Sequence, residues 1–349
     1  MKRIMLIFML VLLQATFVLS QIPDQPFQTL KVGLSIKQIA YSPDGNLLAT
    51  ACGDGLYLCD TRTWDEPRLL IKGNILSAAF SPDGKMLAAG VGWQIGLPDD
   101  WQETIYLWDL QNEKQTELKR RADIAQSVRS VCFSPDSQML VSGDVEGVSF
   151  WDVERKVVIG QLPLGDSWPV YSLAYRHDGN MLAAGTYNTV YLVDPKEQKI
   201  LSIVNERDEI YPEAWILCVG FSPDGTILAS GSGNNVVNLW DVSNLKRIEE
   251  LVHGGDVHFV SFTPDGRQIV YGGWNRVIHI HDMITKETIY WECTYPISSG
   301  ALSPDGKTLA IAGTDWVVSF WRMTKPTTDV RLLNKKPVLW GMLKSGRLD

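Results

Sequence analysis

Cysteine and histidine are scarce in this chain, and neither residue is clustered. Five of each occur among 349 residues, and no two cysteines form a C-x-x-C motif. Structural zinc sites use four closely spaced Cys or His ligands, so we expect no metal site. No glycine-rich phosphate loop follows a strand and opens a helix, so we expect no cofactor either.

Catalytic groupings are also missing. No Ser-His-Asp or Cys-His arrangement stands out along the chain. His279 and His281 share one face of an expected strand, which is a spacing that metals can use, but no third ligand is evident. The sequence therefore gives no positive case for an enzyme, and we expect a non-catalytic protein.

Positive charge is in deficit. The formal net charge is −8, and it becomes −10 if Lys2 and Arg3 are removed with an N-terminal leader. Proteins that bind nucleic acid generally present a basic face to the phosphates. Nucleic acid is therefore not an expected partner.

The N-terminal residues Met1–Ser20 have the composition of a signal peptide. Lys2 and Arg3 are followed by an unbroken apolar run, Ile4–Leu13, which is short for a membrane span. Cleavage is favoured over an uncleaved anchor, so we expect no stable membrane span in the mature protein. The expected location is periplasmic or extracellular, and the short leader suggests a bacterial source.

This interpretation predicts a mature N-terminus at or near Gln21. Mass spectrometry of the exported protein measures it directly. Exported protein that retains Met1 would contradict the prediction.

The cysteine pattern favours free thiols over disulfides. An odd count leaves at least one thiol unpaired in an exported protein. Cys52 and Cys59 lie on neighbouring strands of one expected hairpin but at offset positions, so we expect no bond between them. Buried free thiols are the simplest interpretation of all five.

The most informative feature is a repeat, for which residues 219–241 serve as the reference unit. Two short strands follow a Ser-Pro-Asp-Gly turn in this unit, and a tight Gly233-Asn-Asn turn joins them. Seven copies occur, with turns at Ser42-Pro-Asp-Gly, Ser81-Pro-Asp-Gly, Ser134-Pro-Asp-Ser, Arg176-His-Asp-Gly, Ser222-Pro-Asp-Gly, Thr263-Pro-Asp-Gly and Ser303-Pro-Asp-Gly. Successive turn Asp residues are 39 to 53 positions apart, which is the period of a propeller array with four strands per unit.

In these residues the chain resembles the WD40 repeat family, over roughly residues 27–322. Several units end their third strand in Trp-Asp, as at Trp108-Asp109, Trp151-Asp152 and Trp240-Asp241. The resemblance implies an all-β fold, a seven-bladed β-propeller of four-stranded antiparallel blades. We therefore expect three segments, a signal peptide (1–20), a propeller (21–322) and a C-terminal tail (323–349), which is a solvated tail or a sorting segment.

Two segments compete to close the expected ring. In the family a leading strand usually becomes the outer strand of the last blade, and Phe27–Val32 is placed to do this. Thr328–Leu333 also resembles an outer strand. We favour the N-terminal segment, because closure by it removes an open sheet edge.

The family often carries a hydrogen-bonded set of His, Ser, Asp and Trp in each repeat, and this chain keeps only parts of it. Ser142 with Trp151, and Ser230 with Trp240, are partial sets. In the sixth unit His253 is present, but His281 occupies the Trp position and is expected to pack there. Such sets are structural, so their loss makes this a divergent member of the family.

Aromatic residues gather in the loops of one expected face. Turns between second and third strands open on the same face as the connections between units, and the long loop 91–103 lies there too. Each ring could simply pack over its own blade. As a group, the expected partner-binding residues are Trp93, Asp99, Asp100, Trp101, Trp168, Tyr187, Tyr211, Trp215, Trp274 and Trp316.

The function expected from these features is a binding or scaffold protein that recognises a protein or peptide partner. Two alternatives remain. One is a periplasmic propeller of the TolB type, which also uses Ser-Pro-Asp-Gly turns. The other is a propeller enzyme with its site at the mouth of the central channel.

Overall fold

The computed structural model describes residues 25–92, 102–121, 127–165, 168–205 and 214–323. The leader, the candidate strand Thr328–Leu333 and the rest of the C-terminal segment lie outside these residues. Within the described ranges, no helix is long and apolar enough to cross a membrane.

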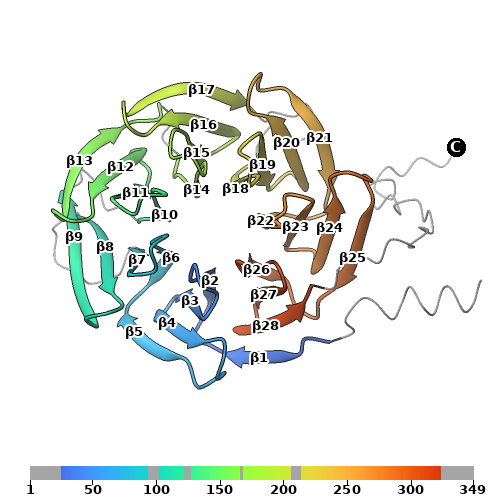
Figure 1. Cartoon of the computed structure of the whole chain (residues 1–349), viewed down its shortest axis with the longest axis horizontal. Coiled ribbons are helices and arrows are strands. Elements are labelled where there is room, and N and C mark those ends of the chain that lie inside the picture. Colours follow the sequence, from blue (N-terminus) through green and yellow to red (C-terminus); the bar gives the residue numbers. More distant parts are fainter. Residues whose placement is uncertain (1–24, 93–101, 122–126, 166–167, 206–213, 324–349) are drawn as a thin grey trace, which may run out of the picture. The chain divides into compact units, whose positions relative to one another are not determined.

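The described chain folds into seven four-stranded antiparallel sheets, which we call blades 1 to 7 (Figure 1). Blade 1 comprises β2 (Ile36–Tyr41), β3 (Leu47–Cys52), β4 (Gly55–Asp60) and β5 (Arg68–Lys72). Blade 2 comprises β6 (Ile75–Phe80), β7 (Met86–Val91), β8 (Gln102–Asp109) and β9 (Lys114–Arg121). Blade 3 comprises β10 (Ser130–Phe133), β11 (Met139–Gly143), β12 (Val148–Asp152) and β13 (Val157–Leu162). Blade 4 comprises β14 (Ser172–Tyr175), β15 (Leu182–Gly185), β16 (Thr189–Asp194) and β17 (Lys199–Asn205). Blade 5 comprises β18 (Ile216–Phe221), β19 (Ile227–Ser232), β20 (Val236–Asp241) and β21 (Arg247–Val252). Blade 6 comprises β22 (Val257–Phe262), β23 (Gln268–Gly273), β24 (Val277–Asp282) and β25 (Thr288–Glu292). Blade 7 comprises β26 (Ile297–Leu302), β27 (Thr308–Gly313), β28 (Val317–Arg322) and β1 (Gln28–Lys31). The expected all-β, seven-bladed propeller is confirmed.

The turn between the first and second strands explains why each unit folds locally. In blade 1 the Ser42 hydroxyl donates to Asp44 at 2.6 Å and accepts from the Leu47 backbone N–H at 2.9 Å. Gly45 adopts a φ of 73°, a left-handed conformation that costs glycine little. Five sister turns repeat the hydroxyl-to-Asp bond. In blade 4 Arg176 replaces the serine and forms an ion pair with Asp178 instead.

The blades form a ring in which each innermost strand contacts the innermost strands of the next and the previous blade. Polar side chains link several of these junctions. The backbone N–H of Ile39 donates to the Ser299 hydroxyl of the preceding blade at 3.1 Å. In the same way, the Ala78 N–H donates to the Gln38 side chain at 2.9 Å, and the Val219 N–H donates to the Ser172 hydroxyl at 3.0 Å. Such bonds set the register of one blade against the next.

The apolar core lies between blades rather than at one centre. One cluster combines Leu56 and Ile71 of blade 1 with Ile75 and Leu87 of blade 2, all of them buried. Small residues such as Ala49 allow the sheets to approach closely. Each blade is therefore stabilised by both of its neighbours, and the first and last blades must also meet.

The N-terminal strand closes the ring, as expected. β1 pairs antiparallel with β28, with Gln28 opposite Phe320 and Lys31 opposite Val317. The backbone N–H of Phe27 also donates to the Phe320 carbonyl at 2.9 Å. Leu30 and Val32 are buried against Phe320 in the same cluster.

All five cysteines are free. Burial raises the pKa of Cys52, Cys59 and Cys293 to about 12. Cys59 lies opposite Leu48 and Cys52 lies opposite Ile36, so the two thiols occupy offset positions. With their thiolate forms suppressed, these residues act as small apolar side chains.

Candidate functional site

Two faces of the propeller can be distinguished from the hydrogen bonds between loops. Turns between second and third strands bond to the connections between blades, as when Gly53 N–H donates to the Leu34 carbonyl and Gly233 N–H to the Trp215 carbonyl. We call this side the loop face. On the opposite side, the turn face, turns between third and fourth strands bond to the turns between first and second strands, for example Thr61 N–H to the Asn46 carbonyl.

The exposed tryptophans of the described residues all lie on the loop face. Their exposed fractions are 45% for Trp168, 48% for Trp215, 56% for Trp274 and 41% for Trp316. The other described tryptophans are buried or partly buried, namely Trp64, Trp108, Trp151, Trp240, Trp291 and Trp321. Exposing four large rings on one side is an arrangement that packing of the blades does not require.

Two of these rings belong to an aromatic cluster over blades 3 to 5. Trp168 stacks on Tyr187, with 4.6 Å between ring centroids and an interplanar angle of 23°. Tyr187 forms an antiparallel backbone bridge with Trp215, whose ring lies 6.3 Å from that of Tyr171. The Arg129 guanidinium carbon lies 5.3 Å from the centroid of the Tyr171 ring, within the range of a cation–π contact.

A buried asparagine holds the cluster in place. Asn188 has a φ of 58° in the turn after β15, and asparagine tolerates this conformation better than most residues. Its backbone N–H donates to the Ala214 carbonyl at 2.7 Å, and its side-chain oxygen accepts from the Ala214 N–H. These two bonds fix the Tyr187 turn against the segment that carries Trp215.

Ion pairs secure the neighbouring loops. Buried Arg120 of β9 contacts Asp144 and Glu146 of blade 3, each at 2.8 Å. The Asp144 carbonyl accepts from the Val170 N–H at 2.9 Å, just before Tyr171. Blades 2, 3 and 4 are thereby connected beneath this part of the loop face, which presents a preorganised surface.

The structure brings together only part of the sequence-predicted set. Trp168, Tyr187 and Trp215 form the cluster, whereas Trp274 packs beside His258 in blade 6, at 5.8 Å between centroids, and Trp316 lies in blade 7. Trp93, Asp99, Asp100, Trp101 and Tyr211 lie outside the described residues. The sequence analysis did not include Arg129 and Tyr171 among the partner-binding residues. Both stand directly before an innermost strand, in the same kind of loop that carries Trp168 and Trp215.

Four of the five histidines gather in or beside blade 6, where they act as packing elements. The Nδ1 atoms of His253 and His279 are 3.1 Å apart, and the His279 ring stacks on Tyr271 at 4.9 Å and 9°. His281 contacts Thr288 through Nδ1 at 2.8 Å and Glu249 through Nε2 at 3.2 Å. Among the residues that the structure describes, no group of three or more His, Cys, Asp or Glu is arranged to hold a metal ion.

The partial hydrogen-bonded sets expected from the sequence are formed. The indole N–H groups of Trp151 and Trp240 donate to the hydroxyls of Ser142 (2.8 Å) and Ser230 (2.9 Å). In blade 6, Tyr271 and His281 occupy the equivalent positions and both are buried. A different set of rings therefore fills the same place in that blade.

Comparison with known proteins gives partial relatives. The chain is 32% identical over 139 residues to the "WD repeat-containing protein SL1-17" of Schistosoma mansoni, which is 40% of this chain and 44% of that protein. It is 24% identical over 147 residues to the "Small ribosomal subunit protein RACK1y" of Oryza sativa subsp. japonica (41% and 42%). It is 27% identical over 210 residues to the "Serine-threonine kinase receptor-associated protein" of Gallus gallus (60% and 55%). The chain thus spans about half the length of these relatives.

A solved structure has the same fold. A chain in the "Crystal Structure of Mitotic Checkpoint Complex" superposes with a TM-score of 0.74 at 21% identity, covering 87% of this chain and 93% of that chain. The family model "WD domain, G-beta repeat" matches residues 25–56, 66–109, 119–151, 210–241 and 245–282, about half of the sequence. The matched repeats and the seven four-stranded sheets point to the same repeat architecture. The chain therefore belongs to the WD40 repeat family.

Proposed function

We propose that this protein is a non-catalytic binding module that holds a protein partner on its loop face. The observation that carries the proposal is the placement of every exposed described tryptophan on that face. Large aromatic rings with little conformational freedom are enriched at the centres of protein interfaces. The partner is expected to contact the aromatic cluster of Trp168, Tyr171, Tyr187 and Trp215.

The relatives support this proposal. The protein from Gallus gallus is named "Serine-threonine kinase receptor-associated protein", and the structural neighbour is a chain in the structure of a complex. Arg129 adds a cation beside the rings, and an Arg next to aromatic residues is a common hot-spot composition. The Asn188 bonds and the Arg120 ion pairs hold the surface before the partner arrives, which lowers the ordering cost of binding.

The test replaces the two most exposed rings of the cluster with alanine, as Trp168→Ala together with Trp215→Ala. A partner is first isolated by affinity capture on the immobilised full-length protein, and its Kd is then measured by calorimetry. We expect the double variant to weaken binding by about tenfold or more, since hot-spot aromatics often contribute over 2 kcal/mol. The melting temperature should change little, because both rings are about half exposed.

The matched control removes exposed apolar side chains elsewhere. Tyr290→Ala with Ile284→Ala changes the outer strand β25 and the turn before it, where these residues are 56% and 73% exposed. Partner affinity should be retained in this control. Equal loss of affinity in both double variants, or none in either, would exclude the aromatic cluster as the binding site.

A further inference from the structure

A proline packs against a glycine at most junctions between neighbouring turns on the turn face. The proline belongs to the turn after the innermost strand of one blade, and the glycine belongs to the same turn of the next blade. A Cβ on Gly45 would lie 3.4 Å from Pro304, and one on Gly266 would lie 3.6 Å from Pro223. The Pro135–Gly179 and Pro264–Gly306 pairs repeat this contact, whereas at Gly84 no atom of the described residues lies within 4 Å of that position.

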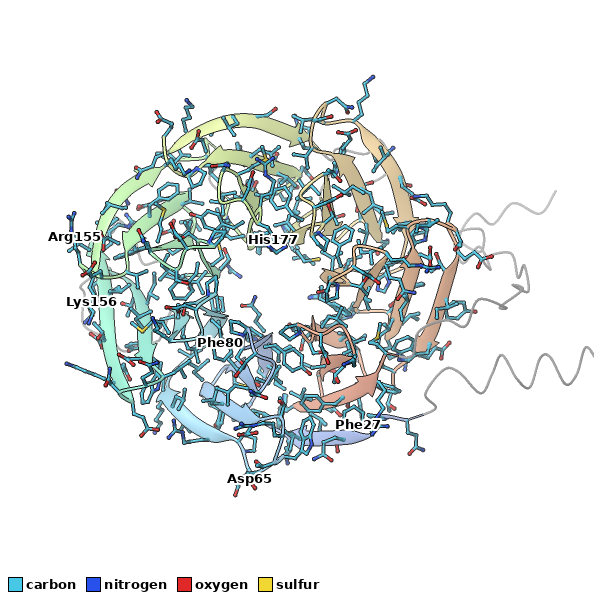
Figure 2. All side chains as sticks on the ribbon, viewed as in Figure 1. Phe27, Asp65, Phe80, Arg155, Lys156 and His177 are labelled. Carbon is cyan, nitrogen blue, oxygen red and sulfur yellow. The ribbon has the colours of Figure 1, made fainter. Side chains whose placement is uncertain are left out.

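Blade 4 breaks the pattern because His177 replaces the proline. The side chain that meets Gly225 of blade 5 is instead the stem of Arg176, whose Cδ lies 2.8 Å from an ideal Cβ position. The Arg176 guanidinium turns back to Asp178 of its own turn, with bonds of 2.9 and 2.8 Å. His177 is exposed and stands at the inner edge of the ring (Figure 2).

At three successive junctions between blades, the volume of the groove differs according to whether the proline and the glycine of this contact are both present. The groove between blades 3 and 4, where Pro135 meets Gly179, has a volume of about 350 Å³. Between blades 2 and 3, where Ser137 replaces the glycine, the volume is about 600 Å³. Between blades 4 and 5, where the proline itself is missing, it is about 960 Å³. Loss of the proline therefore accompanies the largest of these grooves, whose size suits a bound ligand.

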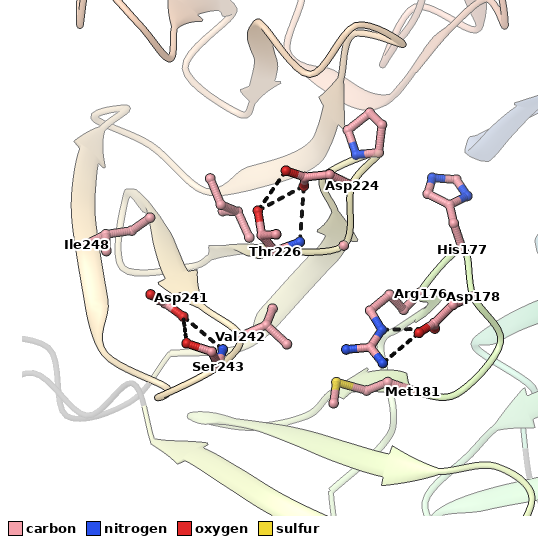
Figure 3. Close-up of a pocket in the computed structure, with 13 residues that line it drawn as sticks. Arg176, His177, Asp178, Met181, Asp224, Thr226, Asp241, Val242, Ser243 and Ile248 are labelled. Carbon is pink, nitrogen blue, oxygen red and sulfur yellow. Dashed lines mark hydrogen bonds and ion pairs between the residues drawn. The ribbon is translucent and has the colours of Figure 1, made fainter.

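The groove between blades 4 and 5 is lined by both acidic and apolar side chains (Figure 3). Asp178, Asp224 and Asp241 line it, and among the described residues that line it Arg176 is the one lysine or arginine. Hydrogen bonds from Arg176, Ser222 and Ser243, respectively, are the main causes that lower the pKa of the three carboxyls. All three are therefore ionised at neutral pH, and the groove carries an excess of negative charge.

Apolar side chains complete the lining. Val242 and Ile248 of blade 5 contribute to it, and Ile248 is 51% exposed. A ligand that carries an aliphatic group next to a cation could thus contact an apolar and an acidic surface in this groove. The chemistry complementary to this groove is a positive charge with an apolar neighbour.

We propose that this groove binds an extended segment of a protein partner in which lysine or arginine alternates with aliphatic residues. The cationic groups lie against Asp224 and Asp241, and the aliphatic groups cover Val242 and Ile248. The site is on the turn face and is independent of the aromatic cluster on the loop face. The protein would then have two binding surfaces, one on each side of the ring.

The test uses a fluorescein-labelled peptide of alternating leucine and arginine, with a leucine–glutamate peptide as the negative probe. Binding to the full-length protein is followed by fluorescence anisotropy at physiological salt. We expect the arginine peptide to bind and the glutamate peptide not to bind. Asp224→Asn with Asp241→Asn should weaken binding about tenfold or more, since two interfacial charges are lost while the Asn Oδ1 atoms can still accept from the hydroxyls of Ser222 and Ser243.

Two further variants separate a shaped groove from general attraction to an acidic surface. Asp44→Asn with Asp60→Asn makes the same charge change in blade 1, at the junction where Pro304 meets Gly45, and should leave binding within about twofold of the parent. Arg176→Ser with His177→Pro restores the turn of the sister blades and should abolish binding by narrowing the groove. If charge alone governed binding, this variant would bind the arginine peptide more tightly, because it removes the positive charge of Arg176 from the groove. Tighter binding to it, or equal losses in both Asp→Asn pairs, would overturn the proposal.

Discussion

Deletion of residues 25–32 should lower the melting temperature by at least about 10 °C, the largest stability effect that we expect from any short change. The deletion removes β1 and its four-residue ladder with β28. It also exposes the buried surface of Phe320 and leaves an open sheet edge in blade 7. Because each blade is supported by both neighbours, the damage extends beyond blade 7.

A milder pair of variants tests the same closure without changing the length of the chain. Leu30→Ala with Val32→Ala removes side chains that are 8% and 1% exposed and should cost about 5 kcal/mol in total. Thr29→Ala with Lys31→Ala alters exposed positions of the same strand and should have little effect. Thermal unfolding followed by circular dichroism compares the two. Deletion protein that melts like the parent would mean that another segment, such as Thr328–Leu333, holds the edge.

Acidification from pH 7 to pH 4 should destabilise the protein through the buried histidines of blade 6. Burial lowers the pKa of His253 from 6.5 to about 3 and that of His279 to about 4. Between these values and pH 6.5 the unfolded chain binds protons that the folded chain does not, so the free energy of unfolding falls as the pH falls. Each imidazole can contribute on the order of 3 kcal/mol of this loss at pH 4.

The variant His279→Phe isolates this effect. Phenylalanine keeps a ring to stack on Tyr271 but cannot take up a proton, so the loss of stability between pH 7 and pH 4 should be smaller than in the parent. Tyr290→Phe changes a ring that contacts His279, at 5.9 Å between centroids, and should leave the pH dependence unaltered. Denaturant unfolding at several pH values gives the comparison. A parental pH dependence in His279→Phe would show that His279 does not contribute to the acid sensitivity.

The fold could be predicted in detail because its information is local and repeated. A Ser-Pro-Asp-Gly turn specifies its own hydrogen bonds, as at Ser42 and Asp44, and seven copies set the number of blades. The closing strand was predictable although Thr328–Leu333 competed for the same place, because closure by the segment before the first innermost strand removes an open sheet edge. Replacement of the usual Trp by His281 also had the expected structural outcome, since its ring is buried.

The candidate site was less predictable, because it depends on contacts between blades. Loop positions placed Trp168, Tyr187 and Trp215 on one face, but the bonds of Asn188 and the bridge between Tyr187 and Trp215 are what bring the last two together. Tyr171 and Arg129 complete the cluster through a ring contact and a cation–π contact that no local pattern indicates. The groove beside His177 had a visible signal, since its turn departs from the repeat, yet its volume depends on how the turns of blades 4 and 5 pack together, which the sequence does not give.

The register of β1 against β28 has a mechanical consequence. The chain enters β1 at Gln28 and leaves β28 at Arg322, and Gln28 lies opposite Phe320, so entry and exit are at the same end of the ladder. Tension applied across these two points would load the hydrogen bonds one after another, beginning with the pair at Phe27 and Phe320, rather than all together in shear. A ring that is closed firmly against heat would therefore open by peeling at a modest pulling force, and blade 7 would be the first to part.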